Sequence, residues 1–297
     1  MSRASTEDLV WDVDGRGWPL AEHSRFVEAA GLRWHLQRLG PANAPRVLLL
    51  HGTGASTHSW REVAPALALR HEVLAIDLPG HAFTSAGPPG AHTLPGMAAA
   101  IAALLRTIDF VPASIVGHSA GAAVAVRMAL DGLAAPRAIV SFNGALLPFG
   151  GLAGRLFMPA ARLLASQPLV PKLFAAHSRD RRVVQRLVGS TGSRLDEQGF
   201  ALYARLVRSP AHAAGALAMM ARWDLRPLER DLPGLAACLH LVAAERDRTV
   251  PPTVAQRVRA RLPQARLVRW NGLGHLAHEE APERAAALIE AVSKESA

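Results

Sequence analysis

Residues 114–121 read Ser-Ile-Val-Gly-His-Ser-Ala-Gly, and this stretch decides the fold. The apolar run Ser114 to Val116 predicts a buried strand, and the alanine-rich run Ala120 to Leu130 predicts a helix directly after it. The pentapeptide between them, Gly117 to Gly121, has the Gly-x-Ser-x-Gly pattern of a tight turn that holds a serine in a strained conformation. Glycine at both ends avoids collisions across the turn. The setting predicts that Ser119 is a nucleophile; an incidental serine in a glycine-rich turn is the alternative.

Strand and helix signals continue to alternate on both sides of this turn. Short apolar runs predict strands at Arg46–Leu50, Glu72–Leu78, Arg137–Phe142 and Leu239–Ala244, with a more polar edge strand at Arg266–Trp270. Helices are expected at Leu94–Ile108, Pro252–Leu262 and Pro282–Val292. Alternation of this kind implies an α/β fold, with a mostly parallel sheet flanked by helices on both faces. Functional residues are then expected at the carboxyl ends of the strands.

Residues 145–224 break this rhythm. Their helical pieces are interrupted by prolines and contain no convincing strand, which predicts an inserted helical lid between two parts of one core, 1–144 and 225–297. The segment from Ala145 to Trp223 carries eleven basic and three acidic residues, so it holds nearly all of the net charge of +9. The lid is therefore expected to be basic and the core balanced.

A serine nucleophile needs a base, and the base needs a carboxylate that fixes its tautomer. Asp247 follows the strand at Leu239–Ala244, and His275 follows the strand at Arg266–Trp270. The chain order Ser119, Asp247, His275 is the one expected for this strand-turn-helix arrangement. Glu245 is the rival acid, which we expect to point into structure or to pair with a neighbouring arginine.

A developing oxyanion needs two donors. The backbone N–H of Ala120 supplies one, and the N–H of Thr53, in the glycine-rich loop after the strand at Arg46–Leu50, is the candidate for the other. His51 in that loop is interpreted as a structural hydrogen-bonding residue. Four further residues are expected near the substrate, with plain core packing as the alternative: Trp60, His118, Phe142 and Phe149.

Several other classes of function are disfavoured. His275-x-x-His278 followed by two glutamates lacks the remaining parts of a metal site, and no phosphate-binding glycine pattern occurs, so neither a metal nor a nucleotide cofactor is expected. Aromatic residues are few in the basic segment, which disfavours nucleic acid. The single cysteine, Cys238, cannot form an internal disulfide, and no signal peptide or membrane span is recognised, so a cytoplasmic location is expected.

These motifs resemble the α/β-hydrolase superfamily: His51-Gly52, Asp77 to His81, Gly117 to Gly121, Asp247 and Gly274-His275. Within it, four stretches are similar to the magnesium-chelatase accessory proteins of bacteriochlorophyll biosynthesis: Gly117 to Met128, Asn143 to Phe149, Leu206 to Trp223 and Gly274 to Glu283. The resemblance implies a role near insertion of Mg²⁺ into protoporphyrin IX in a phototrophic bacterium. Ala82 departs from the superfamily, where glycine often occupies this position, and this concerns only the shape of the loop.

We expect a serine hydrolase that acts on an ester-like carbonyl, with a tetrapyrrole carboxylate or ester as one substrate class. The alternative is a protein without catalytic activity that binds tetrapyrroles or assists magnesium chelatase on a hydrolase scaffold. Hydrolysis of carbon–carbon bonds and haloperoxidation would use similar residues. Ordinary packing with solvated arginines is the simplest interpretation of the basic lid; binding of acidic ligands, contact with the surface of the photosynthetic membrane and contact with chelatase subunits are the others.

Overall fold

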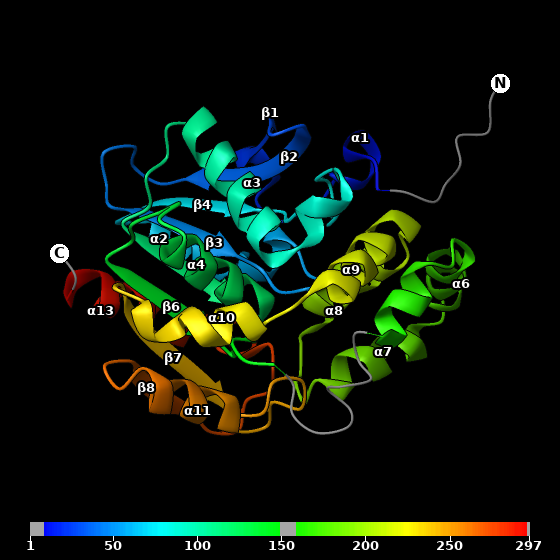
Figure 1. Cartoon of the computed structure of the whole chain (residues 1–297). Coiled ribbons are helices and arrows are strands. Elements are labelled where there is room, and N and C mark those ends of the chain that lie inside the picture. Colours follow the sequence, from blue (N-terminus) through cyan, green and yellow to red (C-terminus); the bar gives the residue numbers. More distant parts are fainter. Residues whose placement is uncertain (1–8, 149–158, 296–297) are drawn as a thin grey trace.

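The computed structural model describes residues 9–148 and 159–295. Its centre is an eight-stranded sheet in the order β1-β2-β4-β3-β5-β6-β7-β8 (Figure 1). The strands are β1 (Ser24–Ala29), β2 (Leu32–Leu39), β3 (Arg46–Leu50), β4 (Glu72–Ile76), β5 (Ser114–His118), β6 (Ala138–Phe142), β7 (Cys238–Ala244) and β8 (Arg266–Trp270). All neighbours from β4 to β8 in this order pair in parallel, which confirms the predicted mostly parallel sheet.

No strand is predicted from the sequence before Arg46, yet β1 and β2 form a hairpin that extends the sheet, with β2 antiparallel to β4. A two-residue turn joins them, with Ala30 at φ 52° and Gly31 at φ 71°. Two consecutive positive φ values match the twist of a tight hairpin. β8 lies at the opposite edge of the sheet, where the analysis placed the most polar strand.

Helices cover both faces of the sheet. One face packs against α3 (Leu94–Thr107), α4 (Ala120–Leu130), α10 (Arg226–Asp231) and α11 (Thr253–Arg261). The other packs against α2 (Val63–Ala68), α12 (Ala277–Glu280) and α13 (Pro282–Glu295). Along β3, Leu48 and Leu50 face the first layer while Val47 and Leu49 face the second, as the two-residue period of a strand requires. Buried apolar side chains on both faces explain the continuous apolar runs of the central strands.

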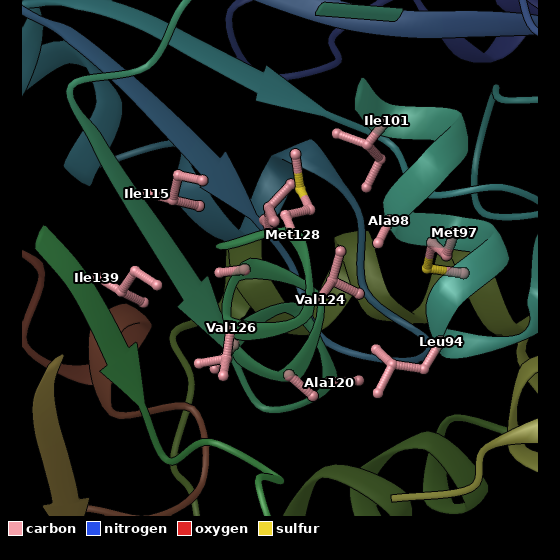
Figure 2. Packing of buried hydrophobic residues seen from close by; sticks show 14 of the residues in the cluster. Leu94, Met97, Ala98, Ile101, Ile115, Ala120, Val124, Val126, Met128 and Ile139 are labelled. Carbon is pink, nitrogen blue, oxygen red and sulfur yellow. The ribbon is translucent and has the colours of Figure 1, made fainter. Parts of the chain in front are cut away.

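Helix α4 begins directly after β5 and lies against α3. Val124 and Met128 of α4 lie on the side of Met97, Ala98 and Ile101, as Figure 2 shows. These side chains are fully buried. Since the helix is fixed against the core along its whole length, its first residue, Ala120, is held rigidly at the end of β5.

The described part of the predicted lid is helical. It contains α6 (Leu169–His177), α7 (Arg181–Ser190), α8 (Glu197–Val207) and α9 (Pro210–Arg222), which lie beyond the carboxyl ends of the strands (Figure 1). The short helix α1 (Trp11–Asp14) lies at the same end of the molecule. None of the helices in residues 9–148 and 159–295 combines the length and the apolar character that crossing a membrane needs.

Candidate active site

Ser119 lies in the sharp turn between β5 and α4. Its backbone has φ 50° and ψ −114°, a sparsely populated conformation for a residue other than glycine. The Ser119 N–H donates to the Phe142 carbonyl at 2.9 Å, so the neighbouring strand supports the turn. A Cβ on Gly117 would lie 2.4 Å from the Ala122 nitrogen, and one on Gly121 would lie 2.3 Å from the Leu50 carbonyl oxygen. Both positions therefore accept only glycine.

His275 and Asp247 form a buried hydrogen-bonded pair. His275 Nδ1 lies 2.7 Å from Asp247 Oδ2, and each residue is 6% exposed. The other oxygen, Asp247 Oδ1, accepts the N–H groups of Thr249 and Val250, both at 2.8 Å. These two donors fix the carboxylate in the turn after β7. A carboxylate at Nδ1 favours the tautomer with its proton there and leaves Nε2 free to accept a proton.

Glu245 has a different role. It is exposed, and its Oε2 accepts the Gly272 N–H at 2.9 Å, so the carboxylate caps the loop after β8. The structure thus places Asp247, and not Glu245, against His275. Glu245 was expected to point into structure or to pair with an arginine, and its observed partner is a backbone amide.

His118 and Asn143 bring the loop of His275 to the turn of residues 117–121 that carries Ser119, which we call the elbow. His118 Nε2 lies 2.9 Å from the His275 carbonyl oxygen, and the two rings lie 4.7 Å apart. Asn143 Nδ2 donates to the carbonyls of Gly274 and His275 at 3.0 and 3.1 Å, while Asn143 Oδ1 accepts the Ala244 N–H at 3.2 Å. Asn143 was not among the predicted site residues. Its signal is weak in the sequence, since asparagine at positive φ, here 48°, is common in turns of any kind.

Ser119 Oγ makes no hydrogen bond to another described residue. In hydrolases without a substrate, the bond between serine and histidine is often long and tightens only in the complex. His118, next to Ser119 in the chain, contacts His275, so the nucleophile and the base lie on adjoining loops. Ser119 is 8% exposed and therefore has little contact with solvent.

Two backbone amides are available at the elbow. The N–H groups of Thr53 and Ala120 donate to no other described residue. Ala120 is the first residue of α4, where amides lack helical partners and the helix dipole favours negative charge. Gly52 lies against the elbow, because a Cβ there would be 2.7 Å from His118 Nδ1 and 3.1 Å from Ser119 Cβ. The loop that carries Thr53 thus lies beside the nucleophile.

His51 holds this loop in place. Its Nε2 accepts the Leu78 N–H at 2.9 Å, and its Nδ1 lies 2.8 Å from the Gly52 carbonyl oxygen. Burial and the neighbouring His81 lower the pKa of His51 to about 3. A neutral imidazole can accept at one nitrogen and donate at the other, as this position requires. The contacts agree with the structural role expected for this residue.

The lid closes over the loop of Thr53 through α9. Thr53 Oγ1 donates to Met219 Sδ at 3.3 Å. His212 Nδ1 accepts the Ala82 N–H at 3.0 Å, and His212 Nε2 lies 3.1 Å from the Gly54 carbonyl oxygen. One lid histidine therefore contacts two core loops. Burial lowers the pKa of His212 to about 4, so the ring is neutral at pH 7.

The aromatic residues expected near the substrate lie elsewhere. Trp60 and Phe142 are fully buried in the core on the α2 and α13 face of the sheet, and their rings lie 6.4 Å apart. Their side chains serve the core, which was the alternative for both residues, so the prediction that they contact substrate is wrong. His118 lies beneath the elbow, where it contacts the loop of His275. Phe149 lies outside the described residues.

A partly buried polar network joins the lid to the helix after His275. Arg61 Nη1 donates to Glu279 Oε2 at 2.8 Å, Arg61 Nη2 donates to Asp196 Oδ1 at 3.2 Å, and Tyr203 Oη donates to Glu279 Oε1 at 2.7 Å. Burial raises the pKa of Glu279 to about 7, although Arg61 and Tyr203 act in the opposite direction. None of these four residues was predicted, because their pairing depends on tertiary contacts between distant segments.

Among residues 9–148 and 159–295, no group of three or more His, Cys, Asp or Glu side chains is arranged to hold a metal ion. The ring of His278 contacts the rings of Trp60 and His118 in tilted arrangements, with centroid distances of 4.4 and 4.5 Å. Neither nitrogen of His278 has a hydrogen-bond partner in the described part of the chain. Burial lowers the pKa of His278 to about 3.

Comparisons with known proteins agree with this architecture. The chain is 38% identical over 272 residues to the magnesium-chelatase 30 kDa subunit of Rhodobacter capsulatus, which covers 92% of this chain and 95% of the relative. An alpha/beta hydrolase fold protein from Burkholderia ambifaria superposes with a TM-score of 0.71 at 25% identity, over 90% of this chain and 99% of that one. An esterase from Exiguobacterium antarcticum gives a TM-score of 0.74 at 16% identity, over 91% of this chain and 98% of that one. A profile of the alpha/beta hydrolase family matches residues 47–288, and the chain belongs to this family.

Proposed function

We propose that this protein is a serine hydrolase that cleaves an ester. Ser119 Oγ attacks the substrate carbonyl carbon while His275 Nε2 takes its proton, and Asp247 stabilises the resulting imidazolium. The N–H groups of Thr53 and Ala120 bind the oxyanion. The imidazolium then protonates the departing alcohol, and an acyl-enzyme remains. Water, deprotonated by His275, attacks the acyl carbonyl and releases the acid and free Ser119.

The observation that carries this proposal is the buried His275–Asp247 hydrogen bond of 2.7 Å beside a strained serine turn. Strain of this kind persists only where the surrounding structure enforces it, and it clusters at functional sites. The amides of Thr53 and Ala120, which donate to no described residue, add what a tetrahedral intermediate requires. A structural turn alone needs neither the oriented histidine nor the free amides.

For the substrate we propose an ester of a tetrapyrrole, in a bacterium that makes bacteriochlorophyll. The support is the similarity to the magnesium-chelatase 30 kDa subunit, together with the basic lid. Arginine pairs bidentately with carboxylates such as propionates. A molecule of this size requires the lid to move, because Ser119, Asp247 and His275 are each 6–8% exposed in this closed form.

A fluorophosphonate probe tests the chemistry. We expect the wild-type protein to be labelled at Ser119, and Ser119→Ala to lose all labelling. Ser166→Ala, which changes an exposed lid serine, is the matched control and should be labelled like the wild type. Wild-type protein that reacts no faster than Ser119→Ala would contradict the proposal.

The second candidate function is a non-catalytic accessory protein that binds a tetrapyrrole or magnesium-chelatase subunits. The name of the Rhodobacter relative and the absence of a hydrogen bond from Ser119 Oγ to another described residue favour it. Fluorescence quenching by protoporphyrin IX separates the two functions. Tight binding that Ser119→Ala leaves unchanged, without turnover of model esters, would favour the accessory role.

For the lid we propose contact with an anionic membrane surface. Between residues 159 and 190 lie six cations and one carboxylate, and the exposed leucines of this segment include Leu163, Leu169 and Leu173. Lys172 lies between two of these leucines on the outer side of α6. Leucines inserted among acyl chains and cations at lipid phosphates are typical of peripheral contact.

Sedimentation with phosphatidylglycerol vesicles tests this contact. Replacement of Leu169 and Leu173 by serine should reduce binding by about a hundredfold or more, since each buried leucine contributes roughly 1.5–3 kcal/mol. The control is Leu69→Ser. Leu69 is 80% exposed and belongs to the α/β part of the molecule, outside the lid. Equal binding of all three proteins would contradict membrane contact and leave protein subunits as the partner of this surface.

A further inference from the structure

The segment that follows α7 runs between the two loops that carry the acid and the base. The Thr191 carbonyl accepts the Arg248 N–H at 3.2 Å and the His275 N–H at 3.3 Å. Arg248 follows Asp247 directly in the chain. One backbone carbonyl of the lid therefore joins the loop of the carboxylate to the backbone of the histidine.

The next residues of the lid strengthen this connection. Ser193 Oγ accepts the Leu276 N–H at 2.8 Å. Glu280 accepts the Arg194 N–H through Oε2 at 3.1 Å and the Gly274 N–H through Oε1 at 2.9 Å. Gly274, His275 and Leu276 thus all have their amides bound by groups of residues 191–194 or by a carboxylate that also binds this segment. We call residues 191–194 the strap.

The strap packs closely against both loops. A Cβ on Gly192 would lie 1.9 Å from the Arg246 carbonyl oxygen, on the side of the acid. A Cβ on Gly274 would lie 2.3 Å from the Gly192 carbonyl carbon and 2.4 Å from the Ser193 nitrogen, on the side of the base. Backbone meets backbone on both sides, and Gly192 has φ 84°, which favours glycine. The strap therefore cannot shift without moving one loop or the other.

We infer that the strap is a positioning element that sets the geometry of the His275–Asp247 pair, so that the lid forms part of the active-site framework. The inference rests on the proposed function for its kinetic consequence, but the hydrogen bond that it concerns is a property of the folded protein alone. The strap touches neither the substrate nor the reacting atoms. It acts through the loops that hold them.

Other groups also fix the lid to the core, close to the helix that follows His275. Arg61 and Glu279 bind Asp196 and Tyr203, which lie just after the strap and on α8. The contacts of α9 involve different core loops, those of Gly54 and Ala82. Opening of α9 for substrate is therefore compatible with a strap that stays in place.

Gly192→Ala tests the inference, with Gly189→Ala as the matched control. Gly189 lies on α7, three residues earlier in the chain, and a Cβ there meets nothing within 4 Å. We expect Gly192→Ala to lower kcat and the rate of fluorophosphonate labelling by about 10- to 100-fold, the usual effect of a misplacement near 1 Å, with little change in KM. The downfield NMR signal of the His275 Nδ1 proton should also broaden or shift. Gly189→Ala should match the wild type in all three measurements.

A second pair of variants covers the case in which Gly192→Ala fails to fold. Ser193→Ala removes the acceptor of the Leu276 N–H, and Ser193→Thr keeps a hydroxyl there. Loss of labelling rate and of the downfield signal in Ser193→Ala, with recovery in Ser193→Thr, would support the inference. Folded Gly192→Ala and Ser193→Ala proteins with the wild-type signal and labelling rate would overturn it. A wild-type protein that shows the signal but no labelling would instead contradict the proposed hydrolase function.

Discussion

Two acidic residues, Glu245 and Asp247, lie two positions apart in the loop after β7, and only Asp247 contacts the base. Asp247 is bound to His275, and Glu245 is bound to the Gly272 amide. We expect Asp247→Asn to lower kcat by roughly 10³- to 10⁴-fold, because the amide stabilises neither the required tautomer nor the imidazolium. Glu245→Gln keeps an acceptor for Gly272 and should stay within about twofold of the wild type. Steady-state hydrolysis of a model ester provides the measurement.

The reverse order of effects would assign the acid to Glu245. A similar loss in both variants would mean that the loop itself has been disturbed, so the far-ultraviolet circular dichroism of each variant is the necessary control. Because the two side chains share one loop and one charge, the pair separates the role of the hydrogen bond from a general effect of acidity.

At the scale of single residues, the sequence predicts a functional role only where the neighbouring residues in the chain form a recognisable pattern. Ser119 stands within a local five-residue pattern, and Asp247 and His275 each follow a recognisable strand. Asn143, Ser193 and His212 make contacts to segments far away in the chain, and nothing local distinguishes them from other turn or helix residues. Trp60 and Phe142 show the opposite error, since an aromatic residue beside a strand end is buried in the core as readily as in a pocket.

At the scale of elements, α9 and the loop after β4 meet without side chains between them. A Cβ on Gly215 would lie 1.9 Å from the Gly80 carbonyl oxygen, and backbone is difficult to displace. We expect Gly215→Ala to lift α9 from the core and to destabilise the protein by about 1–3 kcal/mol, as overpacking typically does. Limited proteolysis should cut the lid faster while the core stays intact. Gly234→Ala, where a Cβ meets nothing within 4 Å, is the control.

Unchanged proteolysis of a folded Gly215→Ala variant would show that this contact does not fix the lid. An increase in fluorophosphonate labelling would also be informative, because Ser119 is only 8% exposed in this structure. Faster labelling together with faster proteolysis would identify α9 as the part of the lid that opens.

Apolar runs and helix-capping signals in the sequence predict the central strands and helices, but they do not predict the hairpin of β1 and β2. Most ends of the predicted core strands and helices coincide with the observed ones, and the others lie one to three residues away. β2 was missed because His35 and Gln37 are polar yet buried, which destroys the alternating pattern. His35 is satisfied by Asp77 at 2.7 Å and Gln37 by the Pro19 carbonyl, and such partners are visible only in the folded chain.

At the scale of the whole molecule, an unusual number of histidines is buried in neutral form. Burial is the main cause that lowers the pKa of eight of them, His92 and His240 included. The reduction is large for six: to about 3 for His51, His81 and His278, to about 4 for His212, and well below 6.5 for His58 and His118. Four of them belong to loops of the candidate site or to its lid contact. The same interior that keeps these rings neutral makes the fold sensitive to acid.

The pH dependence of stability follows from these shifts. In the unfolded chain the histidines bind protons as the pH falls below about 6.5, whereas in the folded protein they resist protonation until far lower pH. Their contribution to stability is therefore complete above about pH 6.5 and is lost as the pH falls. The contribution of Glu279 to stability depends on pH in the opposite way, because its pKa is raised to about 7 in the folded protein. This contribution is complete below the pKa of an unfolded glutamate and is lost as the pH rises through about 7.

Below pH 6, the unfolded chain binds about six more protons at these histidines, and about one fewer at Glu279, than the folded protein does. The unfolded chain therefore binds a net excess of about five protons. Each proton contributes about 1.4 kcal/mol per pH unit, so the free energy of unfolding should fall by up to roughly 7 kcal/mol per unit below pH 6. Because domains are typically stable by only about 5–15 kcal/mol, cooperative unfolding is expected near pH 5. Urea denaturation at closely spaced pH values between 5 and 8 measures this slope. A stability that stays flat from pH 6.5 to pH 5 would mean that the buried rings are already protonated, or hydrated, in the folded protein.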